Sequence, residues 1–246
     1  GVLRRSWGLI LGFGLVSVVG CQVAYFNAVQ RMPIGVALLL EYLAIILVVG
    51  WVWLRTRRPP RASTLAGVAL SIAGLVLVLD LTGSVRLDPV GVVWGLLAAV
   101  GLAVYFVIAA HGDTGLPAVA LAGFGMLAGA LALLGLAWIG VLPTGTASAP
   151  VTMAGVTMPW WLAIGELAIV AAATAYLLGA IGARRLGSTV ASFVGLTEVL
   201  FAVLLAWLLI GELPTPIQLA GGVLILAGVG AVRVGELRAA GAAHPG

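Results

Sequence analysis

Three glutamates stand inside long apolar stretches of the chain, where charged side chains are rare: Glu41, Glu166 and Glu198. Desolvation destabilises a carboxylate in an apolar environment and favours its protonated form. Such a group can take up a proton in one environment and release it in another, or bind the ammonium group of a small molecule. We therefore expect Glu41 and Glu198 to act as proton or cation sites in a central cavity. Glu166 is closer to the end of its apolar stretch and is the weaker candidate.

Other polar side chains in these stretches could line the same cavity. Hydroxyl and amide groups offer hydrogen bonds to a small molecule, and aromatic rings offer cation–π contacts. For each of them, and for the glutamates, a structural role between helices or at the membrane interface is the alternative. The side chains expected to face the cavity are Gln22, Tyr25, Tyr42, Tyr105 and Tyr176.

Residues suited to covalent or metal-assisted catalysis are scarce. His111 lies at the end of an apolar stretch, His244 lies near the C-terminus, and Cys21 is the sole cysteine. No acidic pair has metal-ligand spacing, and no Gly-rich phosphate loop follows a strand. The sequence therefore predicts no enzyme, no metal and no cofactor.

The composition defines the environment of the chain. Of its 246 residues, 63% are hydrophobic and 8% are charged, and the mean hydropathy is +1.23. A soluble domain of this length needs a more polar surface, so the sequence predicts an integral membrane protein. The spans must be α-helices, because barrels need alternating polar and apolar residues. Eight stretches are long enough to span a bilayer: 8–29, 34–54, 64–81, 89–110, 117–141, 159–182, 188–210 and 216–234.

The basic residues indicate orientation, not nucleic-acid binding. The net charge is +4, and every basic residue is Arg. Only Arg31 and Arg86 fall on the side opposite the N-terminus, so the positive-inside rule places both termini in the cytoplasm. The absence of Lys, with abundant Ala, Gly, Val and Arg, indicates a GC-rich genome and therefore a bacterial plasma membrane.

The chain also contains an internal repeat. Residues 30–74 align without a gap with residues 184–228, at a constant offset of 154. Matching spans lie an odd number of spans apart, so the sequence predicts an inverted repeat. Scarce residue types recur at the offset, as in Arg31/Arg185, Trp53/Trp207 and Pro60/Pro214.

The repeat predicts more helices than the eight spans supply. Two spans, 89–110 and 117–141, belong to the second copy but have no counterpart in the first. We therefore expect an N-terminally truncated form of a ten-helix bundle with two five-helix repeats. The predicted units are a partial first repeat at 1–82, a complete second repeat at 88–235 and a cytoplasmic tail at 236–246.

Particular stretches resemble a known family. The stretch 190–228, in which Gly211 and Glu212 form a turn between two apolar helices, resembles the end of EamA-type transporters of the drug/metabolite transporter superfamily. The run from Pro33 to Glu41 is similar to the fourth helix of the threonine and homoserine exporter branch. The family often has its second-copy glutamate, followed by Ser-Pro, at the position of Gly195. Here the acid is Glu198 and no proline follows.

The resemblance implies ten helices in two inverted repeats and secondary active transport. With the buried acids, it predicts proton-coupled export of amino acids or related metabolites by alternating access. A drug exporter, a metabolite exchanger such as a sugar-phosphate type, an importer and a non-transport assembly protein are the alternatives. The expected partners are a small-molecule substrate, protons and the lipid bilayer. Pairs of small residues such as Gly125 and Gly129 favour helix packing within the monomer, and a homodimer stays open.

Overall fold

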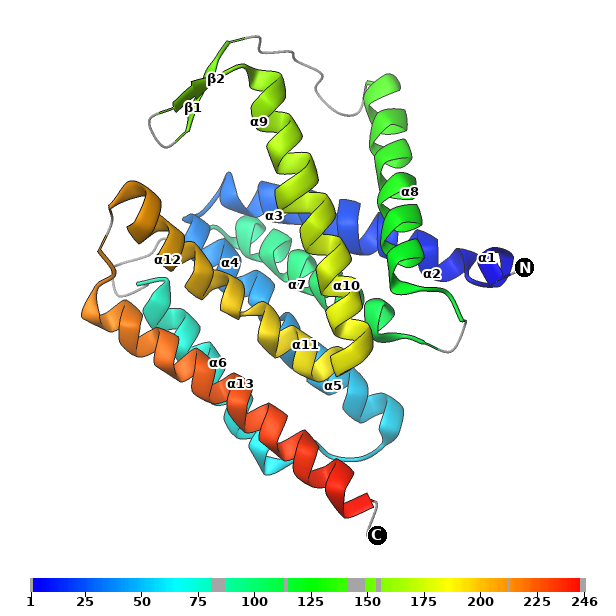
Figure 1. Ribbon diagram of the computed structural model, residues 1–246, viewed down its shortest axis with the longest axis vertical. Coiled ribbons are helices and arrows are strands. Elements are labelled where there is room, and N and C mark those ends of the chain that lie inside the picture. The colour runs from blue at the N-terminus through cyan, green and yellow to red at the C-terminus, as the bar shows by residue number, and fades with distance from the viewer. Residues whose placement is uncertain are drawn as a thin grey trace.

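The protein is described by a computed structural model that covers residues 2–80, 87–112, 115–140, 149–153, 156–211 and 213–243. This part of the chain is built of long helices with one short hairpin (Figure 1). Arg86, Glu212 and His244, which the sequence analysis considers, lie outside the described residues.

The first half of the chain begins with a continuous rod of four helical segments. The rod consists of α1 (Val2–Arg5), α2 (Trp7–Leu11), the π-helical segment η1 (Gly12–Gly20) and α3 (Cys21–Val29). A second rod, α4 (Ile34–Tyr42) and α5 (Ala44–Thr56), breaks at Leu43, and α6 (Ala62–Val78) follows it.

The second half opens with two unbroken helices, α7 (Pro89–Ala110) and α8 (Ala118–Trp138). The Asp88 side chain caps α7 by accepting a hydrogen bond of 2.7 Å from the Gly91 backbone N–H. Strands β1 (Val151–Met153) and β2 (Val156–Met158) pair antiparallel. The remaining elements are α9 (Trp160–Glu166), the π-helical η2 (Leu167–Thr174), α10 (Ala175–Leu186), α11 (Ser188–Gly195), α12 (Thr197–Ile210) and α13 (Pro216–Ala243).

The helices agree closely with the predicted spans. In the described part of the chain, seven apolar helices are long enough to cross a membrane. The eighth predicted span corresponds to α6, which has 17 residues and stands at the short end of the usual range. Large apolar side chains such as Leu134, Ile169 and Phe201 are exposed on these helices, as lipid contact requires. The chain is therefore a multi-pass α-helical membrane protein.

Helices α6 and α13 pack along each other in opposite directions (Figure 1). A β-carbon added to Gly74 would lie 2.6 Å from the Gly221 carbonyl oxygen, and one added to Gly221 would lie 2.6 Å from that of Gly74. Two helical turns away along both helices, Gly67 and Gly228 contact each other in the same manner. Glycine at these four positions lets the two backbones touch, which supplies the packing that helices need in lipid.

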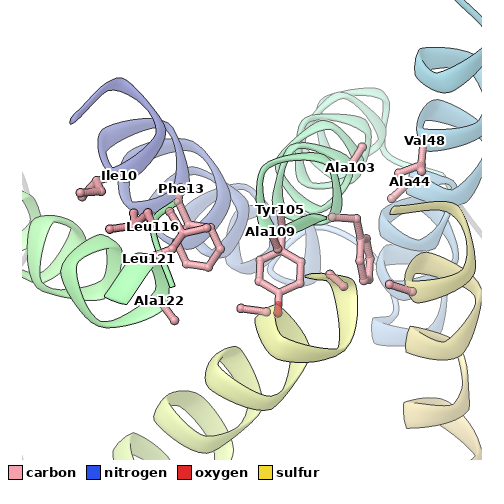
Figure 2. Close-up of a cluster of buried hydrophobic side chains, with 14 of the residues drawn as sticks. Ile10, Phe13, Ala44, Val48, Ala103, Tyr105, Ala109, Leu116, Leu121 and Ala122 are labelled. Carbon is pink, nitrogen blue, oxygen red and sulfur yellow. The ribbon is translucent and has the colours of Figure 1, made fainter. Parts of the chain in front are cut away.

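Pairs of small residues also serve packing between neighbouring helices elsewhere. A β-carbon on Gly125 would collide with the Phe13 ring, and one on Gly129 would meet the Gly14 carbonyl oxygen at 3.1 Å. Figure 2 shows the cluster of buried side chains around Phe13, with the rings of Phe13 of η1 and Tyr105 of α7 side by side. Their ring centroids lie 5.4 Å apart. This cluster packs η1 against α7 and α8.

Candidate functional site

A cavity of about 470 Å³ lies between the first rod, the α4 helix, α7, the η2–α10 rod and the junction of α11 with α12. Its volume falls in the range of sites for small molecules. Seven of the eight side chains predicted from the sequence line it: Gln22, Tyr25, Glu41, Tyr42, Tyr105, Tyr176 and Glu198.

The two cavity glutamates stand beside breaks in their helices. Glu41 lies near the end of α4, two residues before the break at Leu43. Glu198 lies in the first turn of α12, two residues after the break at Leu196. A carboxylate in the first turn interacts favourably with the free N–H groups of that turn. Both acids therefore lie beside a one-residue interruption of a membrane helix.

Each glutamate has a partner on another helix. The Cys21 thiol donates a hydrogen bond to Glu41 Oε1 at 3.3 Å, and its sulfur also lies 3.4 Å from the Ala98 carbonyl oxygen. The Tyr42 hydroxyl donates to Glu198 Oε2 at 3.1 Å. Because Tyr42 follows Glu41 in the chain, the two acids are connected through one dipeptide.

The tyrosines divide into two groups by their surroundings. Tyr105 and Tyr176 stack edge to face, with ring centroids 5.6 Å apart, and the Tyr105 hydroxyl donates to the Tyr176 carbonyl oxygen at 3.3 Å. Tyr105 is 7% exposed, so it holds α10 against α7 and forms the cavity wall. Tyr25 is only half-buried and keeps its ring at the cavity surface.

Glu166 does not join the other predicted side chains. It is exposed at the end of α9 and lines neither this cavity nor the smaller one described below. The rotation of the helix about its axis explains this, because η2 continues from Glu166 without a break and turns Ala171 toward the cavity instead. Asn27, another polar residue of the first rod, donates to the Val23 carbonyl oxygen of its own helix at 2.8 Å.

Ser17 and Cys21 also line the cavity, although the sequence analysis assigned neither of them to it. A signal was present in their spacing. Ser17, Cys21 and Tyr25 follow each other at intervals of four residues, which places them on one side of a helix. Small polar side chains on a face that also carries Tyr25 indicate a polar wall.

A second cavity of about 290 Å³ lies between α4, α6, α12 and α13. Tyr42 and Glu198 line both cavities. Their hydrogen bond therefore stands in the partition between the two spaces. Gln218 of α13 contributes an amide to the smaller cavity and bonds the Val78 carbonyl oxygen at 3.4 Å.

The charged side chains of the larger cavity are acidic. Among the described residues that line it, the charged side chains are Glu41 and Glu198, with no Arg or His. The described part of the chain holds no group of three or more His, Cys, Asp or Glu residues that could bind a metal ion. Carboxylates beside aromatic rings suit an ammonium group, through charge and cation–π attraction.

A bundle of apolar helices around a cavity that contains two carboxylates is typical of a membrane transport protein. The chain belongs to the EamA-like transporter family, whose model matches residues 2–80 and 89–234. This places it in the superfamily that its sequence resembles.

Two curated relatives are similar over a limited stretch. They are the pseudopaline exporters CntI of Pseudomonas aeruginosa strains UCBPP-PA14 and PAO1, each 33% identical over 72 residues. The match covers 29% of this chain and 25% of each exporter. A known crystal structure, described only as that of a protein, superimposes with a TM-score of 0.76 at 23% identity. The superposition covers 96% of this protein and 79% of the chain in that crystal structure, which supports the fold.

Proposed function

We propose that this chain is a secondary active transporter that exports a small amine-bearing metabolite, such as an amino acid or a related compound, in exchange for protons. The observation that carries the proposal is the pair of carboxylates, Glu41 and Glu198, in one cavity that no basic side chain of the described residues lines. The local similarity to pseudopaline exporters supports a metabolite as cargo and export as the direction.

Proton exchange follows from competition for the two carboxylates. A proton and a substrate ammonium group would bind the same carboxylate oxygens. A substrate ammonium group stabilises a carboxylate, so its binding expels a proton, and proton uptake expels the substrate. The neutral donors Gln22 and Tyr25 would receive a substrate carboxylate. A carboxylate that binds either a proton or an ammonium group, but not both, couples the two movements in opposite directions.

The proposed alternating access rests on a pseudo-symmetric bundle. Under the offset of 154, α6 and α13 correspond and pack through reciprocal glycines. The π-helical segments Gly12–Gly20 and Leu167–Thr174 also correspond. The helix breaks at Leu43 and Leu196 differ from the offset by one residue. These relationships support two inverted repeats, which can rock about a fixed central site.

The proposal includes an orientation and a place within the family. We place both termini in the cytoplasm of a bacterium, because the Arg residues gather at the helix ends of that side. The run from Pro33 to Glu41 supports kinship with the threonine and homoserine exporter branch.

The test is flux in proteoliposomes driven by an imposed pH gradient, with radiolabelled amino acids and small amines as cargo. We expect Glu41→Gln and Glu198→Gln each to abolish proton-driven flux. Glu166→Gln is the matched control, because it removes an acid that lines neither cavity. Full gradient-driven flux in both cavity variants would make these acids structural and overturn the coupling mechanism.

A further inference from the structure

Ser17 carries a buried hydroxyl that lacks a hydrogen-bond partner among the described residues. Its residue is 1% exposed, and it lines the same cavity as Glu41. Buried hydroxyls are almost always hydrogen-bonded, because an unpaired one costs free energy. The hydroxyl of Ser17 is therefore an unused hydrogen-bonding group at the edge of the cavity.

Two other buried serines of the described chain share the lack of a partner but not the position. Ser6 and Ser71 line neither cavity. Ser71 lies in the seam between α6 and α13, where its hydroxyl contacts Gly228 and fills packing space. Ser17 thus differs from the other two serines because it lines a cavity, and Ser71 serves as a control residue.

The backbone places Ser17 close to the hydrogen bond between Cys21 and Glu41. Ser17 lies within η1, a π-helical segment, and such segments are frequent at functional sites. Cys21, four residues on, lines the same cavity and bonds Glu41. The hydroxyl of Ser17 therefore stands one helical turn from the residue that holds the Glu41 carboxylate.

Three positions of the second half that correspond to this polar face carry no polar side chain. They are Ala171, Ala175 and Gly179 of the η2–α10 rod, which lie 154 positions after Ser17, Cys21 and Tyr25 and also line the cavity. Tyr176 of the same rod contributes a hydroxyl to the cavity, but from a position that does not correspond to this face. The two sets of corresponding positions therefore differ in polarity.

We propose that Ser17 forms a second polar subsite, in which its hydroxyl binds an uncharged hydrogen-bonding group of the substrate while Glu41 binds the amine. The substrate class is small amines with a hydroxyl or amide close to the nitrogen and an apolar remainder that lies against α10. This inference rests on the proposed function, because it takes the cavity as the transport site.

The test compares two probes that differ by one hydroxyl, 2-phenylethylamine and 2-amino-1-phenylethanol, in calorimetric titrations of the purified full chain. We expect the wild-type protein to bind the hydroxylated amine more tightly, by about three- to tenfold, as one hydrogen bond implies. Ser17→Ala should remove this preference and leave the affinity for 2-phenylethylamine unchanged. Ser71→Ala should keep the preference.

The possible failures are distinguishable. An undiminished preference in Ser17→Ala, or no binding of either amine to the wild-type protein, overturns the subsite. A Ser17-dependent preference without any proton-driven flux keeps the subsite but overturns the proposed exchange. Thermal unfolding of both serine variants checks folding, and midpoints equal to or above that of the wild-type protein are expected because each variant loses one unpartnered buried hydroxyl.

Discussion

The Tyr42 hydroxyl donates a hydrogen bond of 3.1 Å to Glu198, a residue 156 positions later in the chain. Tyr42 is 6% exposed and stands next to Glu41, so this bond joins the two cavity acids across the two halves of the protein. It also lies in the partition between the larger and the smaller cavity. A molecule that moves between the two cavities must therefore break this hydrogen bond or pass around it.

Removal of this bond should slow transport more than it harms folding. Tyr42→Phe keeps the ring in its packed position but leaves Glu198 without its tyrosine donor. We expect proton-driven flux to fall about tenfold, equivalent to one lost bond to a charged group. Initial rates in proteoliposomes measure this effect. Tyr25→Phe, which removes a hydroxyl elsewhere in the same cavity, should have a smaller effect; equal losses in both would contradict a special role for Tyr42.

The α6–α13 seam should tolerate no added methyl group. Gly221→Ala places a β-carbon 2.6 Å from the Gly74 carbonyl oxygen and 2.8 Å from Leu77, so the helices must separate. We expect a loss of roughly 1–3 kcal/mol in stability, as for other overpacked sites. Thermal unfolding in detergent should show a lower midpoint. Gly230→Ala on the same helix meets nothing within 4 Å and should be neutral or slightly stabilising.

Arg184 should hold the end of α7 to the start of α8. Its Nε donates to the Ala109 carbonyl oxygen at 3.0 Å and its Nη1 to that of Leu116 at 2.9 Å. A lysine cannot make this fork, so Arg184→Lys should loosen the chain next to Ala109 and Leu116 although the charge is kept. Hydrogen exchange in that segment should rise. Arg185→Lys, at the exposed neighbouring position, should leave the exchange unchanged.

The sole cysteine of the chain reports the charge of the cavity. Cys21 is buried beside Glu41, so thiol reagents should react slowly. An acidic cavity attracts cations, so a cationic methanethiosulfonate should react roughly tenfold faster than an anionic one of similar size. Mass spectrometry gives both rates. Glu41→Gln should reduce the ratio, and a ratio that favours the anion would contradict the acidic character of the site.

Hydropathy predicted the membrane helices well because helix length and apolarity are local properties of the sequence. Within the described chain, seven predicted spans are helices of membrane length, and the eighth matches the shorter α6. The same reasoning ranked Glu166 below Glu41, because Glu166 lies closer to the end of its apolar stretch, but it could not exclude Glu166 from the cavity. The packing of η2 and α4 decides which of the two meets the cavity.

The polar wall of the cavity could be predicted only partly from the sequence, for a related reason. Ser17 is small and could have been a packing residue, as Ser71 is. Its role depends on the π-helical winding of η1, which hydropathy does not report. The breaks at Leu43 and Leu196 were equally invisible, because neither position carries proline or glycine. Long-range packing, not local preference, therefore sets the directions of the cavity side chains.

The reciprocal contacts of Gly67 with Gly228 and of Gly74 with Gly221 have the form of an isologous interface. In a dimer of two identical short chains, every change in one half would be copied into the other. Here both halves belong to one polypeptide, so the faces they turn toward each other can diverge one mutation at a time. Under the proposed repeat, serine at position 17 and alanine at position 171 would be such a divergence. A cargo with unlike ends can then sit in one orientation, which an identical pair of faces would not specify.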